Sequence, residues 1–327
     1  MRHALLTAAL LALAACDNAG ATRTVGVTAT GVVRGEVFFD ANGSGVRDAA
    51  DAAMPRAVIR VLSRAGADTV LRDSTGTDGT FRFAAVPVGT WVVEVDSASL
   101  GDTVVVAGGR RDTIVVLPND SLDFPAAVTY PGRSVAQVRA QAPGVRVLVR
   151  AIALHARAAF GDTALHVVDA SGALRLVHVR PSAATVAAGD SLVVSGRVAT
   201  LAGQRVLDDV ALFVVGPTLI PTLPAVTTAV ASTGGVAGSL DAALVRTTNV
   251  LVTDTATVNG DFQMTVTDGS GPVTVVLDRN ADTGFRAPLP TGVYVPGNRF
   301  DALGVLVPTG AGAWRLKPRS SLDLTRR

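Results

Sequence analysis

An acidic segment between residues 40 and 51 has residue types and spacing that could bind a metal ion. Side chains that carry oxygen occupy positions 1, 3, 5, 9 and 12 of this segment, glycine occupies position 6, and position 7 can offer its carbonyl. A hard cation such as Ca²⁺ takes six to eight oxygen ligands, and the glycine permits the sharp turn that brings them together. The spacing therefore predicts a calcium site with the ligands Asp40, Asn42, Ser44, Val46, Asp48 and Asp51.

Two departures from the usual calcium loop lower the expected affinity. Ser44 is neutral where Asp or Asn is usual, and Asp51 is one methylene shorter than the Glu that normally chelates with both oxygens. The flanking residues are typical of strands, which excludes a helix–loop–helix arrangement. The alternative is an acidic turn without an ion, because Asp, Asn and Gly are common in turns.

Cys16 is a second candidate for chemistry, because of what precedes it. Residues 4–15 (ALLTAALLALAA) are apolar, and Leu13-Ala14-Ala15-Cys16 follows at their end. Twelve apolar residues are too few to span a membrane as a helix, which needs about 20, so the segment 1–15 is predicted to be a signal peptide. The alternative is an ordinary signal sequence that happens to end in a free cysteine.

The segment before Cys16 resembles the lipobox of bacterial lipoproteins. This resemblance implies that the Cys16 thiol receives an N-terminal diacylglycerol lipid and that the chain is anchored in the bacterial cell envelope, outside the cytoplasm. Several acyl chains make a stable membrane anchor, since each buried CH₂ contributes about 0.8 kcal/mol. Whether the inner or the outer membrane holds the anchor stays open.

Motifs of familiar exported enzymes are missing from the sequence. It contains no HExxH, GxSxG or GxxxxGK motif. The single lysine, Lys317, and the single, acylated cysteine remove Schiff-base and thiol chemistry. We therefore expect a protein that binds or scaffolds rather than an enzyme.

The histidines do not suggest a metal site. His155, His166 and His178 are those outside the signal peptide. If the turn at residues 169–172 pairs Val168 with Ala173, then His178 lies on the core face of the hairpin and His166 on the other face. Separate, individually satisfied histidines are the expected arrangement.

Composition favours an all-β chain. Of its 327 residues 48% are hydrophobic and 33 are glycine, and valine and threonine recur in short runs cut by Gly, Asp, Asn and Pro. The overall net charge of +2 is too small to imply a polyanionic partner for the whole molecule. Residues 17–131 are acidic, with ten basic and fourteen acidic side chains, whereas residues 132–216 are basic, with nine and five.

The chain divides into a row of modules. We expect a signal peptide at 1–15, a flexible tether at 16–30, a β-sandwich at 31–117, a linker at 118–133, and two OB-like five-stranded barrels at 134–217 and 226–325. Strands of the first module are expected at 32–39, 58–62, 80–83, 91–95, 103–106 and 113–116.

The first module resembles the B domain of serine-aspartate-repeat surface adhesins. The matching segments are Gly35-Glu36-Val37-Phe38-Phe39-Asp40, the acidic loop, Ala57-Val58-Ile59-Arg60-Val61, Thr77-Asp78-Gly79-Thr80-Phe81-Arg82-Phe83 and Val88-Gly89-Thr90-Trp91-Val92-Val93. The resemblance covers about a quarter of the chain. It implies a prealbumin-like or immunoglobulin-like sandwich, stiffened by calcium and used as a spacer in surface adhesion proteins.

The rest of the chain repeats itself. Gly161-Asp162, Asp169, Ser171 and Gly172 recur 99 residues later as Gly260-Asp261, Asp268, Ser270 and Gly271. Beyond these motifs the second copy has a nine-residue insertion, because the later matches are offset by 108 residues. The order of strands and turns in each copy resembles the OB-fold of secreted bacterial proteins.

An OB-fold raises the question of a ligand, which fold alone does not answer. Candidate ligand-binding residues are Arg146, Arg150, Arg175 and Trp314. Single-strand binders need a basic groove with aromatic stacking platforms, and neither copy combines both well. The favoured hypothesis is a lipid-anchored scaffold that contacts the membrane through its lipid and an envelope protein or glycan through its modules. The alternative is an extracytoplasmic single-stranded nucleic-acid-binding protein.

Overall fold

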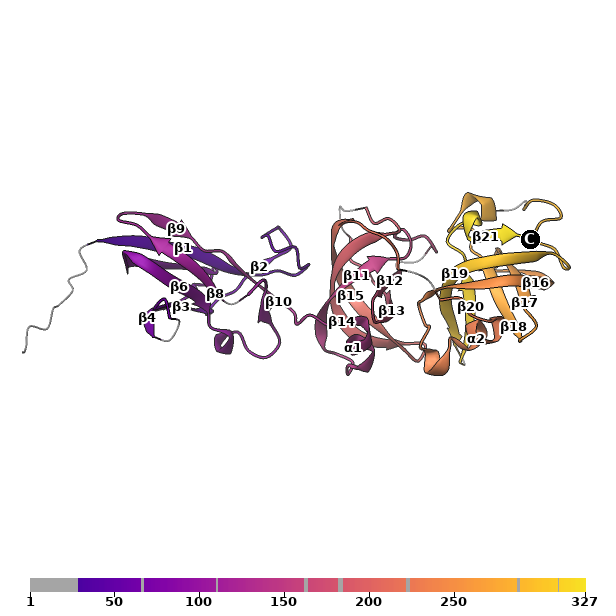
Figure 1. Ribbon diagram of the computed structural model, residues 1–327, viewed down its shortest axis with the longest axis horizontal. Coiled ribbons are helices and arrows are strands. Elements are labelled where there is room, and N and C mark those ends of the chain that lie inside the picture. The colour runs from indigo at the N-terminus through magenta and orange to yellow at the C-terminus, as the bar shows by residue number, and fades with distance from the viewer. Residues whose placement is uncertain are drawn as a thin grey trace, which may run out of the picture.

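The computed structural model describes residues 29–65, 68–109, 111–161, 164–181, 185–221, 224–286, 289–310 and 312–327. Strands dominate it, and its two α-helices have six residues each. The all-β fold class expected from composition is confirmed, with a sandwich, a closed five-stranded barrel, and a second five-stranded barrel whose sheet gains a sixth strand, β21, beside β19. Figure 1 shows these three modules in a row, with the start of β1 at one end and the C-terminus at the other.

The first module packs two sheets face to face. One sheet has the order β2-β1-β10-β7, with β5 and β9 also paired to β1, and the other has the order β4-β3-β6-β8. Inward side chains such as Val33, Ile59 and Phe81 form the core between the sheets. The strands are β1 (Thr30–Phe39), β2 (Ala52–Ala53), β3 (Val58–Leu62), β4 (Thr69–Ser74), β5 (Thr80–Pro87), β6 (Gly89–Val95), β7 (Val105–Val106), β8 (Arg111–Val116), β9 (Ser121–Asp123) and β10 (Ala126–Thr129), with a 3-10 turn at Ser97–Ser99.

The segment expected to be a linker, 118–133, differs from that expectation. Within it β9 and β10 pair in parallel with β1, with Val32 opposite Ser121 and Val37 opposite Ala126. These runs of three and four residues are too short to show an alternating pattern in the sequence, and Pro125 separates them. Pairing with the long β1 therefore completes the sandwich with residues that local sequence patterns do not assign to it.

The two barrels share one strand order. In barrel 1 it is β11-β12-β13-β15-β14, closed by pairing of β14 with β11, and in barrel 2 it is β16-β17-β18-β20-β19, closed by pairing of β16 with β19. This is the five-stranded Greek-key order of an OB-like barrel. Barrel 1 contains α1 (Val135–Ala140), β11 (Arg146–Ala153), β12 (Leu165–Asp169), β13 (Gly172–Leu176), β14 (Asp190–Leu201) and β15 (Gln204–Pro217). Barrel 2 contains α2 (Thr228–Thr233), β16 (Leu244–Val258), β17 (Asp261–Thr267), β18 (Pro272–Leu277), β19 (Arg299–Gly310), β20 (Ala313–Lys317) and β21 (Leu324–Arg326), with 3-10 turns at Val236–Gly238, Thr283–Phe285 and Ser321–Asp323.

The repeated Asp-x-Ser-Gly turn holds a short helix against the core of each barrel. In barrel 1 the carboxylate of Asp169 accepts a hydrogen bond from the backbone N–H of Val135 at 2.8 Å, and the Ser171 hydroxyl accepts one from Ala136 at 2.9 Å. In barrel 2 the backbone N–H of Thr228 donates to the Asp268 carboxylate, and the backbone N–H of Ala229 donates to the Ser270 hydroxyl. These bonds satisfy N–H groups of the first helical turn, which have no partner within a helix. The repeated motif is therefore structural.

Candidate functional site: the acidic loop and the module interfaces

Asp40 lies at the centre of the acidic loop. Its side chain is 1% exposed, and its two carboxylate oxygens accept hydrogen bonds from the backbone N–H groups of Gly43 (2.7 Å), Ser44 (3.0 Å) and Gly45 (2.8 Å). The Asp40 carbonyl also accepts a hydrogen bond from the Thr129 hydroxyl of β10 at 3.1 Å. The loop is thus tied both to itself and to the last strand of the sandwich.

The other predicted ligands also turn towards the interior of the loop. Asn42 donates to Asp48 at 2.8 Å, the Ser44 hydroxyl donates to the Val46 carbonyl at 2.8 Å, and Asp51 accepts from the backbone of Ala41 and Asp48. Burial raises the pKa of the Asp51 carboxyl. Hydrogen bonds from Ala41 and Asp48 oppose this rise, whereas the negative charges of Asp48 and Asp40 add to it. The carboxylates are therefore close enough to repel one another.

The donor set of this loop fits calcium in its chemistry, because all of its groups are hard oxygens. The arrangement of the side chains does not leave these oxygens free for an ion, because backbone N–H groups already bond several of the carboxylate oxygens. Among the described residues, no three or more His, Cys, Asp and Glu side chains are grouped as they would be around a metal ion. Calcium binding accordingly stays a prediction.

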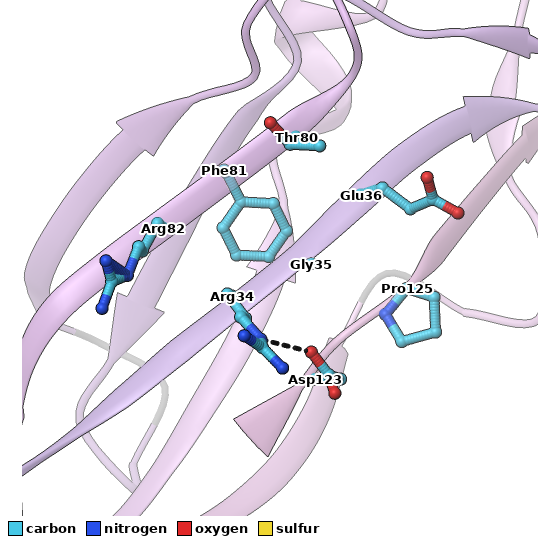
Figure 2. Close-up of a pocket in the computed structure, with 8 residues that line it drawn as sticks. All are labelled: Arg34, Gly35, Glu36, Thr80, Phe81, Arg82, Asp123 and Pro125. Atoms are coloured by element: carbon cyan, nitrogen blue, oxygen red, sulfur yellow. Dashed lines mark hydrogen bonds and ion pairs between the residues drawn. The ribbon is translucent and has the colours of Figure 1, made fainter. Parts of the chain in front are cut away.

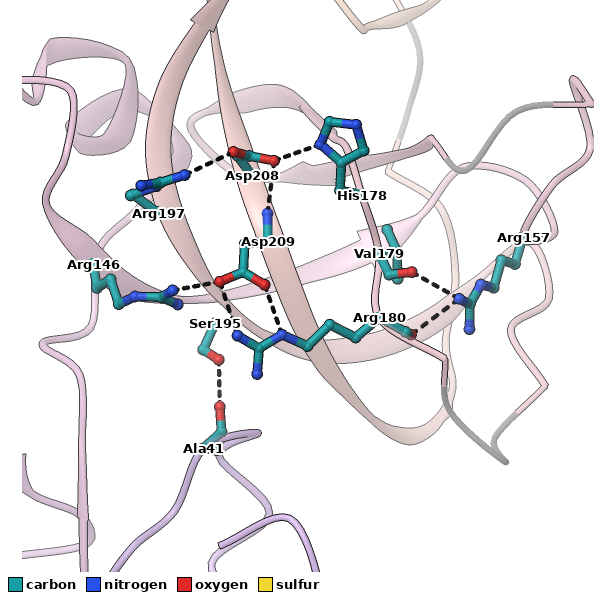
Figure 3. A network of polar contacts seen from close by, with 10 residues as sticks. All are labelled: Ala41, Arg146, Arg157, His178, Val179, Arg180, Ser195, Arg197, Asp208 and Asp209. Carbon is teal, nitrogen blue, oxygen red and sulfur yellow. Dashed lines mark hydrogen bonds and ion pairs between the residues drawn. The ribbon is translucent and has the colours of Figure 1, made fainter. Parts of the chain in front are cut away.

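The loop also forms the contact between the sandwich and barrel 1. The Ser195 hydroxyl of β14 donates to the carbonyl of Ala41 (Figure 3). Gly43, at φ 74°, fits so closely that a Cβ there would meet Cγ1 of Val193 at 2.4 Å and Cδ1 of Leu148 at 2.7 Å. A side chain at position 43 would wedge the two modules apart.

Beside this contact two aspartates hold a set of basic side chains (Figure 3). Asp209 bonds both Arg146 and Arg180, and Asp208 bonds His178 at 2.7 Å and Arg197 at 3.2 Å. Hydrogen bonds from Arg180 and Arg146 hold the pKa of the Asp209 carboxyl well below its usual range. The Arg146 guanidinium also lies 5.8 Å from the ring centre of Tyr130, which follows β10. This predicted ligand residue therefore takes part in the joint between the sandwich and barrel 1.

The structure does not bring the candidate ligand-binding residues together. Arg146 lies over Tyr130 of the first module, Arg150 is exposed on β11, and Arg175 lies on β13 opposite His166. Trp314 is 7% exposed in the core of barrel 2, where its indole N–H donates to Asp241 at 2.8 Å. A ring in this position offers no open face for a base to stack on.

Barrel 2 covers the part of barrel 1 that binds ligands in many OB-folds. In such folds the face of strands 2 and 3 and the loops between strands 1–2 and 4–5 contact oligonucleotides or oligosaccharides. Here the loop after β11 packs on barrel 2, because Leu154 and Phe160 form one buried cluster with Leu244, Val305 and Val307. The outward side chain of Val168 on β12 packs against the same cluster.

Polar contacts follow the same boundary. The Arg319 guanidinium donates to the carbonyl of Leu154 at 3.0 Å, and the Lys317 ammonium lies 4.5 Å from the ring centre of Phe160. Arg139 of α1 donates to the carbonyl of Gly238 in barrel 2 at 3.2 Å. The turn between β14 and β15 reaches barrel 2 as well, because the amide of Gln204 packs beside Gly238. Both loops and the strand face of barrel 1 are therefore engaged.

A continuous apolar run in the sequence is a signal for this interface, although we did not predict the interface from it. In β19, the run Ala302–Val307 is apolar on both faces apart from Gly304, and Val305 is 0% exposed although it points away from the core of barrel 2. Strands that are buried on both faces have such continuous apolar runs. An antiparallel strand of this kind at a barrel surface indicates a second packed layer.

Two expectations about the histidines were wrong. His178 does not lie on the core face, because the chain leaves β13 at Leu176 and turns at His178, whose φ is 49° and whose side chain is 78% exposed. His155 and His166 are not separate, because Nε2 of His155 lies 2.8 Å from Nδ1 of His166. The predicted pairing of Val168 with Ala173 is confirmed, and it places His166 on the outward face of β12.

A pocket on the sandwich contains none of the predicted ligands. It has a volume of about 500 Å³, and its lining is Arg34, Gly35, Glu36, Thr80, Phe81, Arg82, Asp123 and Pro125 (Figure 2). Arg34 and Asp123 form an ion pair of 2.9 Å across it. No serine, cysteine or histidine lies among these lining residues.

Cys16, the signal peptide and most of the tether lie outside the described residues. Within the described part of the chain, the helices are too short to cross a membrane.

Comparisons with known proteins gave the following results. No protein-family model matches the chain, and no curated protein matches its sequence. Among solved structures, the minor pilin GBS52 of Streptococcus agalactiae is 10% identical over 31% of this chain and 45% of the pilin chain, with a TM-score of 0.25. The shaft pilin SpaA of Lactobacillus rhamnosus GG is 7% identical over 59% of this chain and 100% of its own, with a TM-score of 0.25. A murine DNA-binding protein bound to double-stranded DNA is 10% identical over 52% of this chain and 90% of its own, with a TM-score of 0.29.

Two of these neighbours are pilins, and the third is a DNA-binding protein. This chain spans less than half of the minor pilin's length. Because the three TM-scores are below 0.5, the functional conclusion rests on this chain's own residues.

Proposed function

We propose that the chain is a non-catalytic scaffold of the bacterial cell envelope, anchored by lipid at Cys16, that holds its last barrel away from the membrane. The observation that carries this proposal is the linear order of the modules. β1 starts at one end of the row and barrel 2 lies at the other (Figure 1). An anchor before residue 29 would therefore place the sandwich nearest the bilayer and barrel 2 farthest from it.

The contacts between modules support a spacer role. At the joint between sandwich and barrel 1, Ser195 bonds Ala41, and Gly43 is packed against Val193. At the boundary between the barrels, the cluster around Phe160 and the contacts of Arg139 and Arg319 restrain rotation. A row with two packed joints fixes the distance between its first and last modules better than flexible linkers would. We propose an envelope protein or glycan as its partner.

Nucleic-acid binding by barrel 1 has less support. Its excess basic charge is largely neutralised or engaged, since Arg146 and Arg180 bond Asp209 and Arg197 bonds Asp208. Barrel 2 covers the strand face that would read a ligand, and Trp314 is buried. Phosphate binding needs unpaired cations, because its free energy comes largely from counterion release. We therefore do not propose it as the function.

The lipid anchor can be tested by Cys16→Ala. We expect the variant to leave the detergent-extractable membrane fraction and to be found as soluble or uncleaved protein, because the only thiol that could be acylated is gone. Fractionation together with metabolic labelling by a fatty acid measures this. A Cys16→Ala protein that stays in the membrane and still carries the label would contradict the anchor.

Calcium binding at the acidic loop can be tested by thermal unfolding of the full chain. An ion that binds only the folded loop stabilises it by RT ln(1 + [L]/Kd), so a concentration of 100 Kd should add about 2.7 kcal/mol to the sandwich transition. Asp40→Ala should abolish the rise in melting temperature. Asp123→Ala removes an exposed carboxylate elsewhere in the sandwich and should keep the rise. Equal melting curves in chelator and in millimolar calcium would leave only the ion-free acidic turn.

A further inference from the structure

A buried pair of histidines lies where the two barrels meet. His155, in the loop after β11, and His166, on β12, are each 2% exposed. They adjoin Phe160, over which Lys317 of barrel 2 is placed. We call the segment 154–160 with His166, Lys317 and Arg319 the histidine seam. We propose that the histidine seam is an acid-sensitive latch, in which uptake of a proton by His166 releases barrel 2 from barrel 1.

The hydrogen bonds define where the protons are in the closed seam. Nδ1 of His155 lies 2.8 Å from the carbonyl oxygen of Ala156, which can only accept, so Nδ1 carries a hydrogen. The backbone N–H of His166 points at Nε2 of His155 at 3.2 Å, so that nitrogen is an acceptor. Nδ1 of His166, 2.8 Å from the same atom, is then the donor. His166 is neutral in this arrangement.

This assignment leaves the second nitrogen of His166 as a bare lone pair. Nε2 of His166 is buried and makes no hydrogen bond to any described residue. A buried acceptor without a partner is costly, and it is also the one atom of the pair that can take a proton without breaking a hydrogen bond. Protonation at this atom would create a buried cation without a bonding partner.

Three elements around His166 contribute side chains whose charge bears on such a cation. The loop contributes His155, β13 contributes Arg175, and β20 contributes Lys317. The carboxylate of Asp278, at the end of β18, is already bonded to the Lys317 ammonium at 2.6 Å. At the same boundary Asp323 is bonded to Arg319. The carboxylates of Asp278 and Asp323 are thus already engaged with cations of barrel 2.

The direction of the pH effect follows from this environment. Burial, and then the charges of His155, Arg175 and Lys317, hold the pKa of His166 well below its ordinary value of 6.5 while the seam is closed. An opened seam exposes the imidazole to water, where its pKa is near 6.5. The open state therefore binds more protons in acid. Above about pH 6.5 the closed state is fully favoured. Below that pH, the population ratio of closed to open state falls by up to about tenfold for each pH unit.

Opening at the histidine seam would change what barrel 1 presents. The outward face of β12 and β13 and the loop after β11, which barrel 2 covers in the closed form, would become accessible. The latch does not depend on the lipid anchor, because it involves only contacts between the barrels.

Hydrogen exchange of the full chain, followed by mass spectrometry at pH 7.5 and 5.5 and corrected for the intrinsic pH dependence of exchange, tests the latch. In the wild type we expect peptides covering 154–161 and 313–317 to exchange about tenfold faster, relative to their corrected rates, at pH 5.5. Peptides from β3 and β6 of the sandwich should not change. His166→Gln, which cannot take up the proton, should reduce the rise to less than about twofold.

His178→Gln is the matched control, because it removes an exposed histidine from the same barrel and should leave the full rise in place. If His166→Gln does not fold, His166→Leu replaces it, and the wild-type measurement stands by itself. Unchanged protection of the seam in the wild type at pH 5.5 would overturn the proposal. So would an equal rise in a folded His166 variant, or an equal loss of protection across the sandwich.

Discussion

Asp278→Ala is expected to lower the free energy of unfolding of the barrel pair by about 3–5 kcal/mol. The carboxylate of Asp278 bonds the ammonium of Lys317 at 2.6 Å, and their side chains are 3% and 10% exposed. Removing the acid leaves a buried cation without its counter-charge, which costs far more than the loss of a surface pair does. Urea unfolding in a Trp91→Phe background measures the effect, since Trp314 is then the only tryptophan and reports on barrel 2.

Two further variants make this result specific. Asp123→Ala breaks the Arg34 pair, whose side chains are 57% and 67% exposed, and should cost no more than about 1 kcal/mol. Lys317→Met combined with Asp278→Ala should recover much of the loss, because no buried charge remains unpaired. A loss below about 1 kcal/mol for Asp278→Ala alone would mean that Lys317 reaches water and that the boundary is looser than described.

Trp314→Ala is expected to destabilise barrel 2 by about 3–5 kcal/mol, the usual cost of deleting a buried indole. The ring packs closely on Gly234, where a Cβ would come within 2.5 Å of it, and its N–H bonds the buried Asp241. Trp314→Phe keeps much of the volume and should lose less. Hydrogen exchange in β20 and urea unfolding both measure the difference.

The nucleic-acid alternative predicts a different outcome for the same residue. If Trp314 were a stacking platform, Trp314→Ala would weaken binding to single-stranded DNA by about 1–3 kcal/mol per base and leave the fold intact. A salt titration by fluorescence anisotropy with labelled oligonucleotides distinguishes the two. Micromolar binding that survives about 150 mM salt, and that a folded Trp314→Ala protein lacks, would restore that alternative.

Local patterns in the sequence predicted much of the fold. The run Val58–Leu62 is a strand with the predicted bounds, and the turn at Asp169 pairs Val168 with Ala173 as expected. The repeat of Asp169 and Ser171 at Asp268 and Ser270 correctly indicated two similar units, because each pair binds a helix of its own barrel. Patterns of this kind depend on neighbours in the chain, which a sequence displays directly.

The remaining features depend on contacts between distant residues. Residues 118–133 resemble a linker in sequence, because the pairing of β9 and β10 with β1 leaves no periodic signal in so few residues. Trp314 and Arg175 were candidate ligands, since a sequence does not distinguish an aromatic or basic side chain on an open surface from one in a core or at a boundary between modules. The pairing of His155 with His166 joins a loop to a strand and has no local signature.

Small-angle X-ray scattering from the chain beginning at Asp17 tests the central claim that the modules form one fixed row. We predict a scattering curve fitted by the single extended arrangement of Figure 1. Gly43→Leu should loosen the joint and require several orientations, whereas Gly45→Leu should not, because Gly45 shares the positive φ but a Cβ there would have nothing within 4 Å. A wild-type curve that requires a mixture of orientations, or that fits a compact particle, would contradict the claim.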